Sequence, residues 1–186
     1  YPIEEAAITE NVDNCIDERY EEIHFGLQDA VVRILMLGDG MPEQVFWNTL
    51  PKIAATTKAG ADKTLGRYGW GMKVCMSLSE EVRIETGREN FRGAQSWKLI
   101  GGEPYYKEEE PKEKGISRDF TLISLQLNAE YRDKFTSEFI ERTLQKFYPT
   151  LLRGAKVKNR QGEKRVVRMV VNSKPVCPSL EAEYEK

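Results

Sequence analysis

Histidine and cysteine are scarce in this chain of 186 residues, which has one histidine and three cysteines. A single histidine, His24, argues against a histidine-rich metal site and against a Ser-His-Asp triad. The cysteines at positions 15, 75 and 177 are odd in number and lack the paired spacing of a zinc site or a disulfide framework. We therefore expect buried or incidental thiols in a reducing compartment.

Long apolar runs are also missing. No stretch approaches the ~20 apolar residues that span a bilayer, and no signal peptide begins the sequence. We expect an intracellular protein, cytoplasmic or, in a eukaryote, nuclear, with no membrane partner. Because the sequence begins at Tyr1 rather than at Met, we also expect a fragment or a processed form of a longer protein.

A strong charge of one sign is absent too. The net charge is −2, so no global basic field draws the chain onto nucleic acid. The basic run KVKNRQGEKRVVR at residues 156–168 is the local exception. A hairpin whose turn carries solvated charges is the favoured interpretation, ahead of a nucleic-acid contact. With 40% hydrophobic and 31% charged residues, the composition predicts one folded domain over residues 1–186.

The most informative segment is ENVDNCIDE at residues 10–18. On a helix, Glu10 and Asn14 lie one above the other, and Asp17 continues the same stripe. A carboxylate that polarises water therefore lies beside an amide oxygen that can bind Mg²⁺, which suits hydrolysis of a nucleoside triphosphate. Taken alone, the segment favours the interpretation as a solvated acidic helix face.

Two glycine clusters follow. The apolar run VVRILML at residues 31–37 predicts a buried strand, and it leads directly into GDGMP at residues 38–42. Later, LGRYGWGMK at residues 65–73 has glycines that open an apolar helical stretch, with Lys73 on its first turns. Free N–H groups at such a helix start favour anion binding. Each cluster alone is also explained by a tight turn.

These three segments together resemble the nucleotide-binding motifs of the GHKL ATPases, the superfamily of gyrase B subunits, ninety-kilodalton heat-shock chaperones, histidine kinases and MutL-type proteins. The segment RYGWGMKVCMSLSEEVRIETG is similar to sequences of the MORC branch of this superfamily. The resemblance implies that Glu10 is the general base for water attack and that Asn14 is the Mg²⁺ ligand. The implied nucleotide-binding residues are Asn14, Asp17, Gly38, Asp39, Gly40, Met41, Gly69, Gly71, Lys73 and Thr121.

One position departs from the family pattern. The second motif of the family has an aspartate two residues before the first glycine, and its carboxylate accepts a hydrogen bond from the adenine amine; here that position is Met36. A thioether is a poor acceptor for an amine. Asp39 is three residues away on an extended strand, roughly 10 Å, which is too far to replace the missing carboxylate on the same backbone path. We therefore expect weak discrimination between ATP and GTP.

The pattern along the chain predicts a two-layer α/β sandwich, with a mixed sheet and helices on one face, and the resemblance implies that it is of the Bergerat type. Helices are expected at 3–24, 43–50, 69–79 and 137–152, the last ended or kinked by Pro149. Strands are expected at 30–37, 81–86, 94–100 and 119–127. The resemblance places an ATP lid at 51–68, and the charged segment 101–118 is expected to be an exposed loop.

Three functions fit these observations. The first is binding and hydrolysis of ATP with Mg²⁺, driving a conformational or dimerisation cycle; by resemblance the chain forms a homodimer and its partner is DNA or a DNA-associated protein. The second is a degenerate nucleotide-sensing or structural module without turnover. The third is phosphotransfer of the histidine-kinase type, against which stands the lack of a phosphoacceptor histidine segment.

Overall fold

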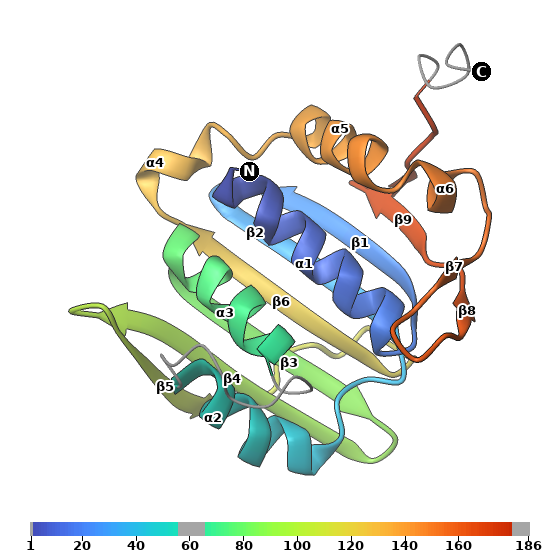
Figure 1. Cartoon of the computed structure of the whole chain (residues 1–186). Helices are drawn as coiled ribbons and strands as arrows, with labels where there is room; N and C mark the ends of the chain where they lie inside the picture. Colours follow the sequence, from blue (N-terminus) through green and yellow to red (C-terminus); the bar gives the residue numbers. More distant parts are fainter. Residues whose placement is uncertain (1, 56–65, 180–186) are drawn as a thin grey trace.

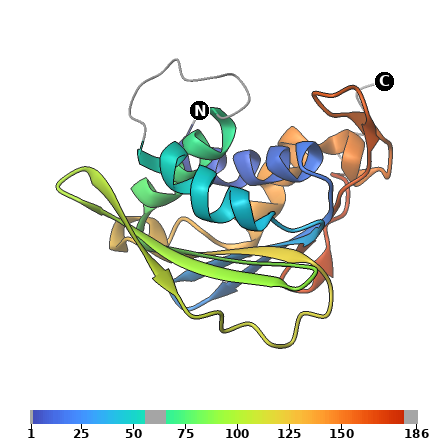
Figure 2. The ribbon, with the colours of Figure 1, turned by 90° about the horizontal axis from the view of Figure 1, so that it is seen from below.

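An eight-stranded sheet carries a layer of helices on one face, as the computed structural model of residues 2–55 and 66–179 shows (Figures 1 and 2). Its strand order is β10-β9-β1-β2-β6-β3-β4-β5, and neighbours are antiparallel except for β1 and β9. The strands are β1 (Tyr20–Gln28), β2 (Val31–Gly38), β3 (Ser79–Arg88), β4 (Phe91–Ile100), β5 (Glu103–Glu109), β6 (Phe120–Leu127), β9 (Arg168–Val171) and β10 (Lys174–Pro175).

The helical layer is built mainly from α1 (Ile3–Asp17), α3 (Gly66–Leu78) and α5 (Ser137–Phe147), with α1 in the middle (Figure 1). Shorter helices are η1 (Val45–Thr49), α2 (Leu50–Ala55), α4 (Ala129–Arg132) and α6 (Pro149–Leu152). None of the helices in residues 2–55 and 66–179 is both long and apolar enough to cross a membrane.

Alternating side chains explain how the sheet binds the helical layer. In β2, Val32, Ile34 and Met36 are buried against the helices, whereas Arg33 points to the opposite face. The amphipathic pattern of α5 buries Ile140 and Leu144 in the same way. The predicted two-layer architecture, a mixed sheet with helices on one face, is therefore confirmed.

The first predicted helix, residues 3–24, is too long. The helix α1 ends at Asp17, and Arg19 follows in the left-handed region with φ of 62°. The remainder of the predicted helix is strand β1, where Ile23 and Phe25 alternate into the core. His24 consequently lies in a strand and its Nε2 is 2.9 Å from the Glu22 carboxylate, not at a helix end.

The predicted exposed loop at 101–118 is also wrong in its first half. Residues 103–109 form β5, which pairs with β4 along the edge of the sheet. The second half, residues 110–118, is a strap that runs across the sheet face opposite the helices (Figure 2). The buried Glu85 carboxylate accepts the backbone N–H groups of Lys112 and Glu113 at 3.1 and 3.0 Å. Arg33 and Arg92 hold the same strap through Glu113.

Other boundaries agree more closely with the sequence. Strand β2 and strand β6 match the predicted strands at 30–37 and 119–127. Helix α5 ends at Phe147, just before Pro149, which begins the short helix α6. The basic segment forms the predicted hairpin, with β7 (Val157–Lys158) paired to β8 (Lys164–Arg165). Of the predicted lid, 51–55 belongs to α2, 66–68 begins α3, and 56–65 lies outside the described residues.

Candidate functional site

The two helices that carry the first and third motifs pack against each other. Gly71 of α3 faces α1 so closely that a Cβ atom built on it would be 3.5 Å from Glu10 Cβ and 3.8 Å from Asn14 Nδ2. The sequence separates Glu10 and Gly71 by about sixty residues, and the fold makes them neighbours. Three of the predicted site residues therefore belong to one location.

Glu10 is partly buried in this interface. Burial raises the pKa of its carboxyl group above the usual value, and the nearby charge of Asp13 acts in the same direction. Arg160 opposes both effects. A carboxylate with a raised pKa is a stronger base than an ordinary exposed glutamate, as a group that accepts a proton from water should be.

Asn14 lies one helical turn after Glu10, and it is 8% exposed. In the part of the chain that the structure describes, neither side chain has a hydrogen-bond partner that would occupy its oxygen atoms. No group of three His, Cys, Asp or Glu side chains able to hold a metal occurs among the described residues. Mg²⁺ commonly uses one or two protein oxygens together with substrate phosphates, so the Asn14 amide oxygen fits this role without such a group.

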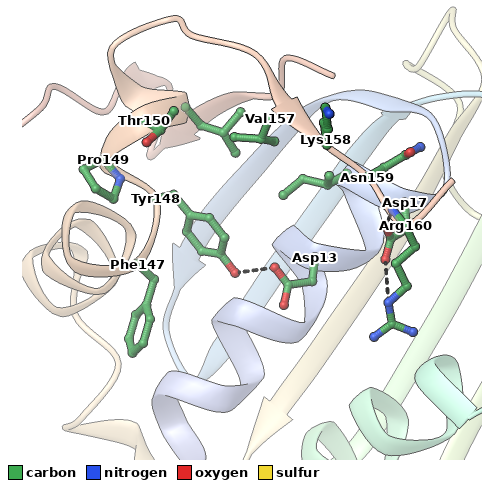
Figure 3. Close-up of a pocket in the computed structure, with 12 residues that line it drawn as sticks. Asp13, Asp17, Phe147, Tyr148, Pro149, Thr150, Val157, Lys158, Asn159 and Arg160 are labelled. Atoms are coloured by element: carbon green, nitrogen blue, oxygen red, sulfur yellow. Dashed lines mark hydrogen bonds and ion pairs between the residues drawn. The ribbon is translucent and has the colours of Figure 1, made fainter. Parts of the chain in front are cut away.

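Asp17 is engaged elsewhere. Its Oδ1 accepts the backbone N–H of Arg160 at 3.1 Å, and its Oδ2 is 3.8 Å from Arg160 Nε (Figure 3). Arg160 belongs to the turn of the β7–β8 hairpin, which covers the end of α1. The expectation that Asp17 shares one free stripe with Glu10 and Asn14 therefore needs correction, because the hairpin binds its carboxylate.

The glycines of the second motif allow two close backbone approaches. A Cβ on Gly38 would lie 2.5 Å from the carbonyl oxygen of Arg19. Gly40 has φ of +69°, and a Cβ there would lie 2.4 Å from the carbonyl oxygen of Gly87. Each position requires glycine for a structural reason. Between them, Asp39 is exposed at the surface.

The glycines of the third motif lie inside α3 and do not precede it. The helix begins at Gly66, so Gly69 is in its first turn and Gly71 in its second. Lys73 is the eighth residue of the helix, not a residue of its first turn, and its side chain is partly exposed. Gly69 and Gly71 are the fourth and sixth residues of α3, so their N–H groups belong to the helix ladder and not to the free helix start.

Thr121 lies at the centre of a buried polar row on the helix-facing side of the sheet. It pairs with Met36 on β2 and with Thr86 on β3. The three side chains are at most 2% exposed. Thr86 Oγ1 is 3.0 Å from Thr121 Oγ1 and also accepts the backbone N–H of Met41 at 2.9 Å, so the row ties the second motif to β3.

Tyr20 completes this row, and neither Tyr20 nor Thr86 was among the residues predicted from the sequence. The Tyr20 hydroxyl is 2.7 Å from Thr121 Oγ1, and burial raises the pKa of this phenol well above its usual value. The alternation of apolar and polar residues along β3 could have predicted that the side chain of Thr86 faces the helices. Nothing local could have pointed to Tyr20, because it lies in a stretch that reads as helix.

A pocket of about 400 Å³ lies on the other side of α1, under the β7–β8 hairpin (Figure 3). The Tyr148 hydroxyl donates to Asp13 Oδ1 at 2.9 Å on its wall. Burial raises the pKa of Asp13, and the hydrogen bond from Tyr148 partly offsets this effect. Asp13 and Asp17 of α1 line this pocket, whereas Gly71 of α3 contacts Glu10 and Asn14 of the same helix.

The fold and the site together define a class: a mixed sheet covered by helices, in which a helix with a glutamate and an asparagine packs on a glycine-bearing helix. A family model described as "Histidine kinase-, DNA gyrase B-, and HSP90-like ATPase" matches residues 1–114. The chain belongs to this family, as the sequence resemblance predicted.

Among solved structures, the chain is similar to the ATPase region of topoisomerase II from Saccharomyces cerevisiae, with a TM-score of 0.55 and 18% sequence identity. The match covers 94% of this chain and 47% of that chain, so this chain spans about half the length of the structure it matches. At this identity the similarity establishes the fold. A search of curated proteins found no match to this chain.

Proposed function

We propose that the chain binds ATP together with Mg²⁺ beside the interface of α1 and α3 and hydrolyses it. The observation that supports this proposal best is the contact of Gly71 with Glu10 and Asn14. A glycine at this point brings the helix backbone of α3 within contact distance of a carboxylate and an amide, and we place the phosphate chain beside these two groups.

In this proposal Glu10 accepts the proton of the attacking water, and its raised pKa makes it suited to that step. Asn14 holds the metal through its amide oxygen. Mg²⁺, when bound, neutralises charge on the phosphates. Gly69 and Lys73 would assist with the phosphates from α3, whereas Gly38, Gly40 and Met41 shape the second motif. Asp17, Asp39 and Thr121 complete the proposed nucleotide-binding set, Asp17 through its hold on Arg160.

We further propose that ATP binding closes the domain and favours a homodimer, and that hydrolysis reverses this. The family to which the chain belongs and its similarity in fold to the ATPase region of a topoisomerase support such a cycle. DNA or a DNA-associated protein is the proposed partner on the same grounds, and the proposed location is the cytoplasm or, in a eukaryote, the nucleus.

The decisive experiment compares ATP turnover and ATP affinity in matched variants. Glu10→Ala should lower turnover by ~10²-fold or more while ATP still binds, which is the usual effect of removing a positioned base. Asn14→Ala should instead weaken the binding of Mg–ATP. Glu5→Ala is the control, because Glu5 lies on the same helix and pairs with Lys146 at 3.1 Å. Equal turnover in the wild type and Glu10→Ala would refute the assignment.

A second candidate is a nucleotide sensor without turnover. It is favoured by one observation: Met36 replaces the acidic residue of the family pattern, and Thr121, the strand partner of Met36, is hydrogen-bonded to the buried Tyr20. Binding of ATP with no turnover in the wild type, alone or as a dimer, would support this candidate over the ATPase. Transfer of phosphate from ATP to protein would instead support the kinase-type alternative.

A further inference from the structure

The side chain of Tyr20 extends across β2 on the helix-facing side of the sheet. Tyr20 stands opposite Gly38 in the β1–β2 pair. A Cβ on Gly38 would be 3.2 Å from Cδ1 of the Tyr20 ring, so the ring passes over the place where any other residue would have a side chain. From there its hydroxyl reaches Thr121 on β6, the next strand beyond β2.

This path takes the phenol to Thr121, the strand partner of position 36, where the family pattern has its carboxylate. Thr121 pairs directly with Met36, and Gly38 is two residues further along the same strand. Tyr20, Met36 and Thr121 are each at most 2% exposed, so they form a closed floor below α1. A purine that approached position 36 from the α1 side would therefore meet the Tyr20 ring and the Met36 side chain, not an open end of a pocket.

The hydroxyl hydrogen atoms of Tyr20, Thr121 and Thr86 are all donated to hydrogen bonds within the floor. Thr86 Oγ1 donates to the carbonyl oxygen of Phe120 at 2.7 Å, so towards Thr121 it can only accept. Thr121 must then donate to Thr86, and its oxygen accepts from Tyr20 at 2.7 Å. The chain of hydroxyl groups runs in one direction, from Tyr20 to Thr121 to Thr86 to Phe120. No hydroxyl in it has a hydrogen left to donate to a base.

We propose that Tyr20 sets the base selectivity of the site by filling its base end, so that the protein takes nucleoside triphosphates through their phosphates and leaves the base largely unread. This inference rests on the proposed function, because it concerns the same nucleotide. It deepens that function by naming the substrate class as nucleoside triphosphates with a tolerant base position. Tyr20 is the residue that fills the base end, and Met36 offers no acceptor to the base.

The experiment is calorimetry with Mg²⁺ and ATP, GTP, CTP or tripolyphosphate on four proteins. For the wild type we expect dissociation constants for the three nucleotides within about tenfold of one another, and measurable binding of tripolyphosphate. Met36→Asp should still show no selectivity, because the Tyr20 ring separates the new carboxylate from a base. Tyr20→Leu combined with Met36→Asp opens the floor and supplies the acceptor, and it should prefer ATP to GTP by more than tenfold.

The matched control is Phe25→Leu combined with Met36→Asp. Phe25 is a buried aromatic residue of the same strand, 1% exposed, and its replacement removes a similar volume away from the floor. This control should behave like Met36→Asp alone. Thermal melting of each variant establishes that it is folded, and the wild type and Met36→Asp test the proposal even where a double variant does not fold.

The outcomes distinguish failure of the proposed role of Tyr20 from failure of the proposed function. A wild type that prefers ATP to GTP by more than tenfold, or a Met36→Asp variant as selective as the Tyr20→Leu double variant, overturns the role of Tyr20 and leaves the proposed function standing. A wild type that binds neither the nucleotides nor tripolyphosphate overturns the proposed function and the role of Tyr20 with it.

Discussion

Asp17 at the end of α1 accepts the backbone N–H of Arg160 at 3.1 Å, so the β7–β8 hairpin is fixed to the helix that carries Glu10. This contact holds the Arg160 guanidinium near three carboxylates of α1, at positions 10, 13 and 17. The C-terminal hairpin and the first motif are therefore coupled, although the sequence places them at opposite ends of the chain.

The first prediction concerns this arginine. Arg160 lowers the pKa of Glu10, so Arg160→Gln should raise it further. If Glu10 is the base, it must be ionised to act, and the acid limb of the pH–rate profile should move to higher pH in this variant. Steady-state ATP hydrolysis measured across pH tests this. Lys164→Gln, an exposed change in the same hairpin, is the control; an unshifted acid limb in Arg160→Gln would contradict the prediction.

The second prediction concerns stability and follows from the sign of the Glu10 shift. A folded-state pKa above the ordinary value, 4.5, means that the folded protein holds the proton more tightly than the unfolded chain does. Stability is then lost as pH rises from the unfolded-state pKa through the folded-state pKa. Glu10→Gln removes this loss, so it should raise the melting temperature at neutral pH and have less effect at acidic pH.

Glu4 on the same helix gives the opposite control. The hydrogen bond from Lys134, 2.6 Å long, lowers the pKa of Glu4. Its contribution to stability is present above the unfolded-state pKa and is lost as pH falls through the folded-state pKa. Glu4→Gln should therefore lower the melting temperature at neutral pH. Shifts of the same sign in the two variants would show that burial does not govern Glu10.

The third prediction concerns Gly71. The nearest atoms to a Cβ at this position are at 3.5 and 3.8 Å, which is ordinary contact, so Gly71→Ala should fold. Alanine within a helix should add roughly 0.5–1 kcal/mol of stability. The added methyl group intrudes where we place the phosphates, and overpacking of about 1–3 kcal/mol should weaken ATP binding by about tenfold or more. Higher melting temperature with unchanged ATP affinity would argue against a nucleotide at this interface.

Local pattern was enough to predict much of the fold and part of the site. The spacing of Glu10 and Asn14 is fixed by the helix itself. Strand β2 was predictable from the sequence because a buried strand is apolar along its length. Helix α5 was equally predictable from the spacing of its apolar residues. These features depend only on residues close together in the chain.

The remaining features depend on partners that are distant in sequence. The stretch after Asp17 is rich in good helix formers, and only its pairing with β2 and β9 makes it strand β1. Strand β5 contains proline and glutamate, which disfavour strands, and it forms because β4 supplies its hydrogen bonds. Tyr20 was missed for the same reason, since its role depends on Thr121, a hundred and one positions away.

The last prediction concerns the strap at residues 110–118. Its backbone is held by the Glu85 carboxylate, which is 1% exposed, accepts two N–H groups and pairs with Arg83 at 3.2 Å. Glu85→Ala leaves the two N–H groups without their acceptor and removes one of the two partners of Arg83, which still donates to the Glu110 carbonyl oxygen at 2.7 Å. Because hydrogen bonds to a charged group contribute about 1.5–3 kcal/mol each, the variant should lose about 3 kcal/mol or more of unfolding free energy.

Urea denaturation measures this loss, and amide exchange locates it. Exchange should accelerate at Lys112 and Glu113 more than in α5, which does not touch the strap. Glu81→Ala is the matched control, because Glu81 lies on the same strand and pairs only with the half-exposed Lys98 among the salt bridges of the described residues. Its effect should stay within about 0.5 kcal/mol, as for other surface changes. Unchanged protection of the strap in Glu85→Ala would show that the arginines alone hold it.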